Sequence, residues 1–138
     1  MTLLELYNYA SANGIRVDAF PLGKTEALSL QDRDGDCFIA IDPFRLRSTA
    51  DEKSKLGHEL GHCMTGAFYG TDCTWDVRAR LENRAEKWEI ENLIGREALD
   101  AAVRAGYTEI WELAERFGVT EELMRKAVCW YRDGRLES

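Results

Sequence analysis

The sequence lacks any long run of apolar residues. No stretch comes near the roughly 18 consecutive apolar residues that a membrane-spanning helix needs, so no membrane partner is predicted. Near the N-terminus, the acidic Glu5 stands where an export signal would carry basic residues. We therefore expect a soluble, cytoplasmic protein.

Basic residues are scarce relative to acidic ones. The chain has 18 Lys and Arg against 25 Asp and Glu, and its formal net charge is −7. A general nucleic-acid binder presents a basic face to the phosphates. This charge balance therefore predicts no nucleic-acid partner.

Cysteines are few, and no two of them form a CxxC pair. Cys37, Cys63, Cys73 and Cys129 are widely spaced in a chain for which no export is predicted. Disulfides are rare in a reducing cytoplasm, so we expect reduced, half-buried thiols. The spacing does not indicate a second, cysteine-based zinc site.

The order of helical and strand-like segments predicts an α+β fold. A helical pattern ends at Asn13-Gly14, and three runs of strand-forming residues follow at 15–20, 27–30 and 37–42. The turn-like segments between these runs predict a three-stranded antiparallel meander that packs against helices. Thr49 and Glu52 form a capping box, which predicts a helix from about Ala50 to Gly66.

Four more helices are expected after that one. The first runs from about Asp76 to Ile94, and the second covers residues 98–106. Two further helices, separated by a short turn at Val119-Thr120, complete the chain. The buried stripe of the helix over 76–94 is predicted to consist of Val77, Leu81, Ala85 and Trp88.

Both histidines of the chain lie in one motif, His58-Glu59-Leu60-Gly61-His62, which matches HExxH. Residues four apart project from the same face of a helix, so both imidazoles can reach one Zn²⁺ at about 2.0–2.1 Å. Glu59 points about 100° away from His58 around the helix. This position suits a general base that takes a proton from the attacking water.

The third metal ligand must be a carboxylate or a cysteine, because no third histidine exists. The next helix offers Glu82, Glu86 and Glu89, and from the residues alone Glu82 and Glu86 are equal candidates. Asp72 and Cys73 are nearer in sequence but lie in the turn between the helices. Zn²⁺ is the expected cofactor, although this ligand set would also accept Mn²⁺.

Two further features accompany the motif. Gly61 costs a helix interior about 1 kcal/mol relative to Ala, which makes sense if the backbone of another helix passes close by. A peptidase of this type also needs a group that stabilises the oxyanion, and Tyr69 and Arg78 are candidates for that role.

HELGH, the pattern ExxA at Glu82-Asn83-Arg84-Ala85 and the tail LAERFGVTEELMRKAV together resemble the ImmA/IrrE metallo-endopeptidases of bacteria and their mobile elements. The resemblance covers most of the chain and implies a zincin-like, gluzincin core with Glu82 as the third ligand. It also implies a cytoplasmic endopeptidase that cleaves a protein regulator, such as a helix-turn-helix repressor of a phage or mobile element. Glu86 and Trp88 depart from the residues usual in the family.

We therefore expect one domain, 1–138, in three parts. Residues 1–47 form the first helix and the strands, 48–95 the two ligand-bearing helices, and 96–138 the C-terminal helical segment. Two other functions remain open, a non-catalytic metal-binding module and a DNA-binding regulator that uses the helix-turn-helix-like tail. Residues 104–138 hold six basic and seven acidic side chains, which disfavours DNA binding.

Overall fold

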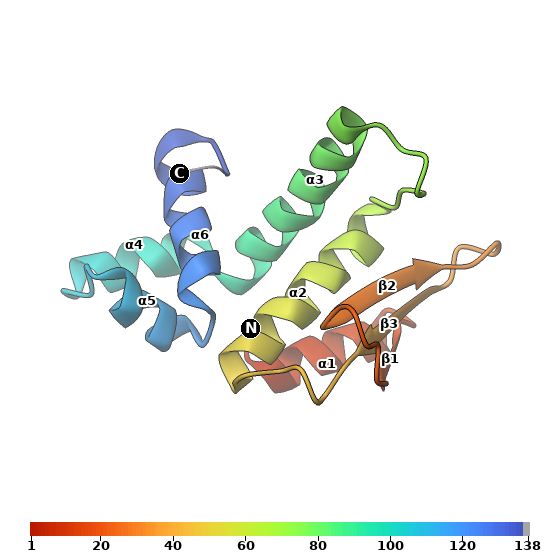
Figure 1. Ribbon diagram of the computed structural model, residues 1–138. Helices are drawn as coiled ribbons and strands as arrows, with labels where there is room; N and C mark the ends of the chain where they lie inside the picture. Colours follow the sequence, from red (N-terminus) through yellow and green to blue (C-terminus); the bar gives the residue numbers. More distant parts are fainter. Residues whose placement is uncertain (137–138) are drawn as a thin grey trace.

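The computed structural model describes residues 1–136, so Glu137 and Ser138 at the end of the predicted C-terminal segment lie outside the described residues. The chain has the predicted α+β class (Figure 1). The elements are α1 (Leu3–Ala12), β1 (Arg16–Ala19), β2 (Ala27–Gln31), β3 (Cys37–Ile41), α2 (Thr49–Thr65), α3 (Trp75–Leu93), α4 (Arg96–Arg104), α5 (Ile110–Phe117) and α6 (Glu121–Asp133).

The sheet is mixed, so the predicted antiparallel meander is wrong. Its order is β1-β3-β2: β3 pairs with β2 in antiparallel and with β1 in parallel orientation. β3 occupies the centre because Cys37, Ile39 and Ile41 are buried. Parallel neighbours need a crossover of about a dozen residues or more, and the segment from the end of β1 through β2 supplies it. The carboxylate of Asp42 holds this crossover by accepting the backbone N–H of Leu22 at 3.0 Å.

The helix that carries HExxH begins one residue earlier than expected and has a different cap. The Ser48 side chain accepts the backbone N–H of Asp51 at 3.0 Å, so the predicted capping box of Thr49 and Glu52 is wrong. Glu52 instead accepts the hydroxyl of Tyr7 on α1 at 2.5 Å. The helix ends at Gly66, as predicted, in a left-handed conformation with φ 69°.

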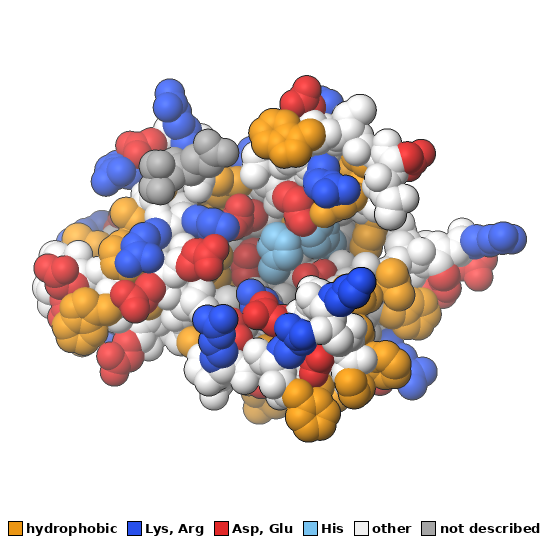
Figure 2. Space-filling model, in the orientation of Figure 1, with side chains coloured by type: hydrophobic (Ala, Val, Ile, Leu, Met, Phe, Trp, Pro, Cys, Tyr) orange, Lys and Arg blue, Asp and Glu red, His pale blue; other side chains and the backbone are white. Residues whose placement is uncertain are grey.

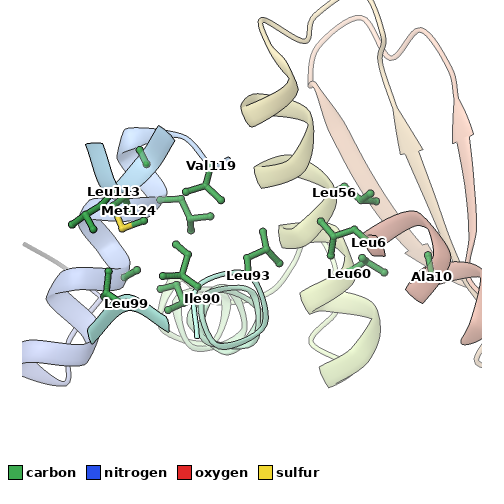
Figure 3. Close-up of a cluster of buried hydrophobic side chains, with 14 of the residues drawn as sticks. Leu6, Ala10, Leu56, Leu60, Ile90, Leu93, Leu99, Leu113, Val119 and Met124 are labelled. Carbon is green, nitrogen blue, oxygen red and sulfur yellow. The ribbon is translucent and has the colours of Figure 1, made fainter. Parts of the chain in front are cut away.

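The buried face of α3 differs from the predicted stripe. Ala85 is fully buried as expected, whereas Val77, Leu81 and Trp88 are only half-buried. The C-terminal half of α3 lies between α2 and the last three helices, and residues there complete the core (Figure 3). The residues of α3 that this packing buries are Ala85, Glu89, Ile90 and Leu93.

The α5–α6 turn docks on the N-terminal half of α2. The backbone N–H of Thr120 donates to the Ser54 hydroxyl at 3.1 Å, and the Lys53 ammonium donates to the carbonyl of Phe117. Tyr131 of α6 donates its hydroxyl to the carbonyl of Ile94 at 2.6 Å, which ties α6 to the end of α3. These bonds hold the C-terminal helices beside the HExxH helix.

Two of the four cysteines form a disulfide, so the prediction of reduced thiols is wrong for them. Cys37 of β3 and Cys63 of α2 are linked, with their Cα atoms 5.9 Å apart. The pairing follows from the packing of α2 on the sheet, which spacing in sequence does not reveal. Cys73 is a half-buried thiol and Cys129 a buried one. None of the helices within residues 1–136 has the length and apolar character needed to cross a bilayer.

Candidate metal centre

Three side chains from two helices converge on one point. The Nε2 atoms of His58 and His62 are 3.2 Å apart. Oε2 of Glu82 lies 3.2 Å from Nε2 of His58 and 2.8 Å from Nε2 of His62. Metal–ligand bonds of about 2.0–2.1 Å in tetrahedral geometry separate neighbouring ligand atoms by about 3.3 Å. The two histidines and Glu82 therefore fit a small metal ion, and they could hold it without rearrangement.

The close approach of α2 and α3 makes this convergence possible. A Cβ atom at Gly61 would lie 2.3 Å from the carbonyl oxygen of Ala85, much too close for any side chain. Ala85 follows Glu82 by one helical turn. The expectation that Gly61 marks the passage of another backbone is thus confirmed, and that backbone belongs to the helix that carries Glu82.

Each histidine has an acceptor beside the nitrogen that faces away from Glu82. His62 Nδ1–H donates to the carbonyl of Ala67 at 2.6 Å. His58 Nδ1 lies 3.6 Å from Oε1 of Glu89. In both rings, Nε2 is the nitrogen that points to the convergence of the three side chains.

The electrostatics of the site follow from this clustering. Burial by itself lowers the pKa of His58, but the carboxylates of Glu82 and Glu89 outweigh it and raise that pKa to about 10. Hydrogen bonds from His58 and His62 hold the pKa of Glu82 well below its ordinary value. Burial raises the pKa of Glu89 to about 7, against the attraction of His58. The site thus has a strong affinity for positive charge.

Glu59 stands apart from the three converging side chains. Its Oε1 accepts the hydroxyl of Ser29 on β2 at 2.8 Å. This bond turns the carboxylate toward the sheet, along the wall of the cavity that both residues line. Ser29 carried no signal in the sequence, because nothing there places β2 beside the HExxH helix.

The other candidates occupy different positions. The Tyr69 hydroxyl donates to Oε1 of Glu82 at 3.0 Å, so the structure brings this residue to the site. The guanidinium of Arg78 lies 5.1 Å from the centre of the Tyr69 ring, on which it forms a cation–π contact. Glu86 pairs with Lys126 at 2.7 Å and lies outside the cluster. Asp72 and Cys73 are also outside it.

Two cavities adjoin these residues. One, of 370 Å³, is lined by residues of β2, by Glu59, His62 and Glu82, and by the loop that carries Tyr69. The other, of 270 Å³, lies among α2, α3 and α6 and contains His58 on its wall. Figure 2 shows the histidines at the floor of a depression that is surrounded by acidic side chains. The site is therefore accessible from solvent through a polar, largely acidic cleft.

Comparison with known proteins agrees with this geometry. The model of the IrrE N-terminal-like domain family, Peptidase_M78, matches residues 10–128, which is most of the chain. Comparisons with curated proteins and with solved structures found no match. The matched span includes the whole HExxH helix and the helix that carries Glu82. The chain therefore belongs to the IrrE N-terminal-like family, Peptidase_M78, and its function is of the metal-dependent peptidase type.

Proposed function

We propose that this chain is a zinc-dependent endopeptidase with a zincin-like, gluzincin core. The observation that carries the proposal is the convergence of His58, His62 and Glu82 to within 3.2 Å of one another on two helices. Two imidazoles and one carboxylate are the ligands of a catalytic zinc site that retains an open position. When bound, the ion would polarise the scissile carbonyl and make water more acidic.

Glu59 is the general base in this proposal. It lines the same cavity as His62 and Glu82 without joining their cluster, so its carboxylate is available to accept a proton from the attacking water. It then delivers that proton to the leaving amine. Ser29 orients the carboxylate through its hydrogen bond. The hydroxyl of Tyr69 is better placed than Arg78 to stabilise the oxyanion, because it borders the cavity directly.

The edge of the sheet supports a peptide as the substrate. β2 pairs with β3 on one side only, so its other backbone edge is available for pairing within the described sheet. Residues of this edge line the cavity beside Glu59. An extended peptide that adds to β2 as a further strand would lie along the site, with its backbone held by hydrogen bonds.

The identity of the substrate rests on the family resemblance. We propose a protein regulator in the cytoplasm, such as a helix-turn-helix repressor of a phage or mobile element. The alternative of DNA binding by the tail is not favoured, because Glu121 and Glu122 occupy the first turn of α6. In a helix-turn-helix that end of the second helix contacts the bases, and acidic residues repel the phosphates there.

The test uses metal analysis and cleavage together. Plasma mass spectrometry should find about one zinc per chain in the wild type and in Glu59→Gln, but far less in Glu82→Gln. Cleavage of a synthetic peptide library, followed by mass spectrometry, should be lost in both variants. Glu91→Gln is the control, since Glu91 is exposed on the same helix as Glu82.

A Glu59→Gln variant that cuts as fast as the wild type would disprove the mechanism. A wild type that binds zinc but cleaves no peptide would instead favour the non-catalytic metal-binding module, in which Glu59 has no role. A well-folded wild type that binds no zinc after its addition would disprove the metal centre itself.

A further inference from the structure

Glu89 is a buried carboxylate that none of the roles above requires. It lies on α3, two turns after Glu82, and only 2% of its surface is exposed. Its Oε2 is the one fully buried side-chain oxygen or nitrogen within residues 1–136 that has no hydrogen-bond partner. Burying an acidic group without partners costs stability, so the position calls for a compensating interaction.

Among the groups near Glu89, His58 is the one available to supply that interaction. His58 Nδ1 is 3.6 Å from Oε1 of Glu89. Lys126, whose ammonium group also acts electrostatically on Glu89, is already paired with Glu86 at 2.7 Å. A Cβ atom at Gly57 would lie 2.7 Å from the side chain of Leu93 and 3.2 Å from Oε2 of Glu89. The glycine therefore makes room for both Leu93 and the Glu89 carboxylate against the HExxH helix.

We propose that Glu89 is a positioning residue of the metal centre, which accepts the Nδ1–H of His58 and so directs Nε2 of that ring toward His62 and Glu82. The inference rests on the proposed function, because it assumes that His58 is a ligand. A distance of 3.6 Å exceeds a hydrogen bond of about 3.0 Å. Both side chains line the 270 Å³ cavity, which leaves room for the small ring rotation that closes the gap.

The two histidines differ in what holds them. His62 donates to the carbonyl of Ala67, a neutral backbone group, at 2.6 Å. His58 faces a carboxylate. An imidazole whose Nδ1–H donates to a carboxylate is a stronger electron donor to its metal than one whose Nδ1–H donates to a carbonyl. The charge of Glu89 therefore strengthens one ligand, in addition to fixing its tautomer and orientation.

The test compares Glu89→Met, Glu89→Gln and the control Glu91→Gln, which changes an exposed residue of the same helix. Zinc affinity is measured by competition with a chelating dye. Loss of a group that orients a metal ligand typically weakens binding about 10- to 100-fold, and we expect this for Glu89→Met. Glu89→Gln keeps an oxygen that can accept the Nδ1–H, so it should lose less. The control should bind zinc as the wild type does.

Two further readouts separate positioning from a merely structural role. The chain has only two histidines, so both imidazole Nδ1–H signals of the zinc-loaded protein can be assigned by NMR. In Glu89→Met the His58 signal should shift or vanish while the His62 signal stays in place. Without zinc, the unfolding temperature of Glu89→Met should differ little from that of the wild type, because replacing a buried acid by an apolar side chain of similar size offsets the lost attraction for His58.

The outcomes distinguish this inference from the proposed function. Wild-type zinc affinity in Glu89→Met, with both imidazole signals unchanged, would overturn the role of Glu89 alone. Equal losses of zinc affinity in Glu89→Gln and Glu89→Met, in step with equal losses of thermal stability, would also overturn it. A wild type that binds no zinc would instead disprove the proposed function.

Discussion

The α2–α3 pair buries charged and polar side chains, whereas the interior of the α5–α6 pair is apolar. The first pair buries Asp51, Lys53, Ser54, His62 and Glu89. The second pair, among the described residues, buries no charged side chain, and its interior consists of Leu113, Ala114, Leu123, Met124, Ala127 and Cys129. Both are pairs of packed helices, but only one carries the chemistry.

The apolar interior of α5–α6 stabilises the fold, whereas the ionisable side chains of α2–α3 provide the reactive groups. Apolar burial stabilises at about 25 cal/mol per Å², so α5 and α6 contribute to stability in the ordinary way. Buried ionisable groups cost stability unless each has a partner. In α2–α3, His62 pairs with Glu82 and Glu89 lies beside His58, so the order of these side chains depends on the site being complete.

Gly61→Ala should produce the largest effect, because it separates the two ligand-bearing helices. Its Cβ would lie 2.3 Å from the carbonyl oxygen of Ala85, a backbone atom that cannot rotate away. We expect a loss of more than about 3 kcal/mol in the free energy of unfolding, together with the loss of metal binding. Urea denaturation and metal analysis measure the two quantities. A variant that retains its metal would show that α2 and α3 can part without harm to the site.

Leu113→Ala should destabilise the fold and spare the site. Leu113 of α5 is 3% exposed and packs beside Met124 in the core (Figure 3). The cavity left by its side chain should lower the free energy of unfolding by about 2–3 kcal/mol, measured by urea denaturation. Zinc affinity of the folded protein should not change. A fall in zinc affinity with Leu113→Ala would show that packing in α5–α6 also determines the metal site, contrary to this prediction.

Over a single pH unit, the pH dependence of metal binding should be the smallest effect, about 1.4 kcal/mol or tenfold. Glu82 and Glu89 outweigh burial and raise the pKa of His58 to about 10 in the protein without metal. Metal must therefore displace a proton from His58, and affinity should rise as the pH increases from neutral toward that value. Dye competition at several pH values measures the slope.

The same shift affects the stability of the protein without metal. The folded pKa of His58 lies above its ordinary value of 6.5, so the stabilising contribution is present below about pH 6.5 and is lost as the pH rises toward 10. Leu113→Ala should lower stability equally at all these pH values. A metal affinity that does not vary with pH would contradict the proton displacement.

Local patterns predicted the helices well. Asn13-Gly14 and Gly66 ended their helices, and HExxH placed two imidazoles on one face, because these signals act within one or two turns. The interior of α3 was less predictable. Glu89 would be a solvated residue on most helices, and its burial depends on where α2 and α6 pack.

Features that join distant segments could not be read from the sequence. The parallel pairing of β1 with β3, the Cys37–Cys63 disulfide and the bond from Ser29 to Glu59 each join residues far apart in the chain. No short-range signal encodes such pairings. Gly61 was an exception, because a glycine in a helix interior is costly enough to imply a neighbour, and Ala85 is that neighbour.

The contact between Gly61 and Ala85 also makes the metal centre selective by ionic size. Two backbones that already touch cannot move closer, while the packing of α2 and α3 in the core opposes their separation. The ligand atoms are therefore held at 2.8–3.2 Å from one another, a spacing for bonds of about 2.0–2.1 Å. A large ion such as Ca²⁺ takes about 6–8 oxygen ligands at 2.3–2.6 Å, so it would need a wider spacing and more oxygens than this cluster offers, and we expect it to bind poorly.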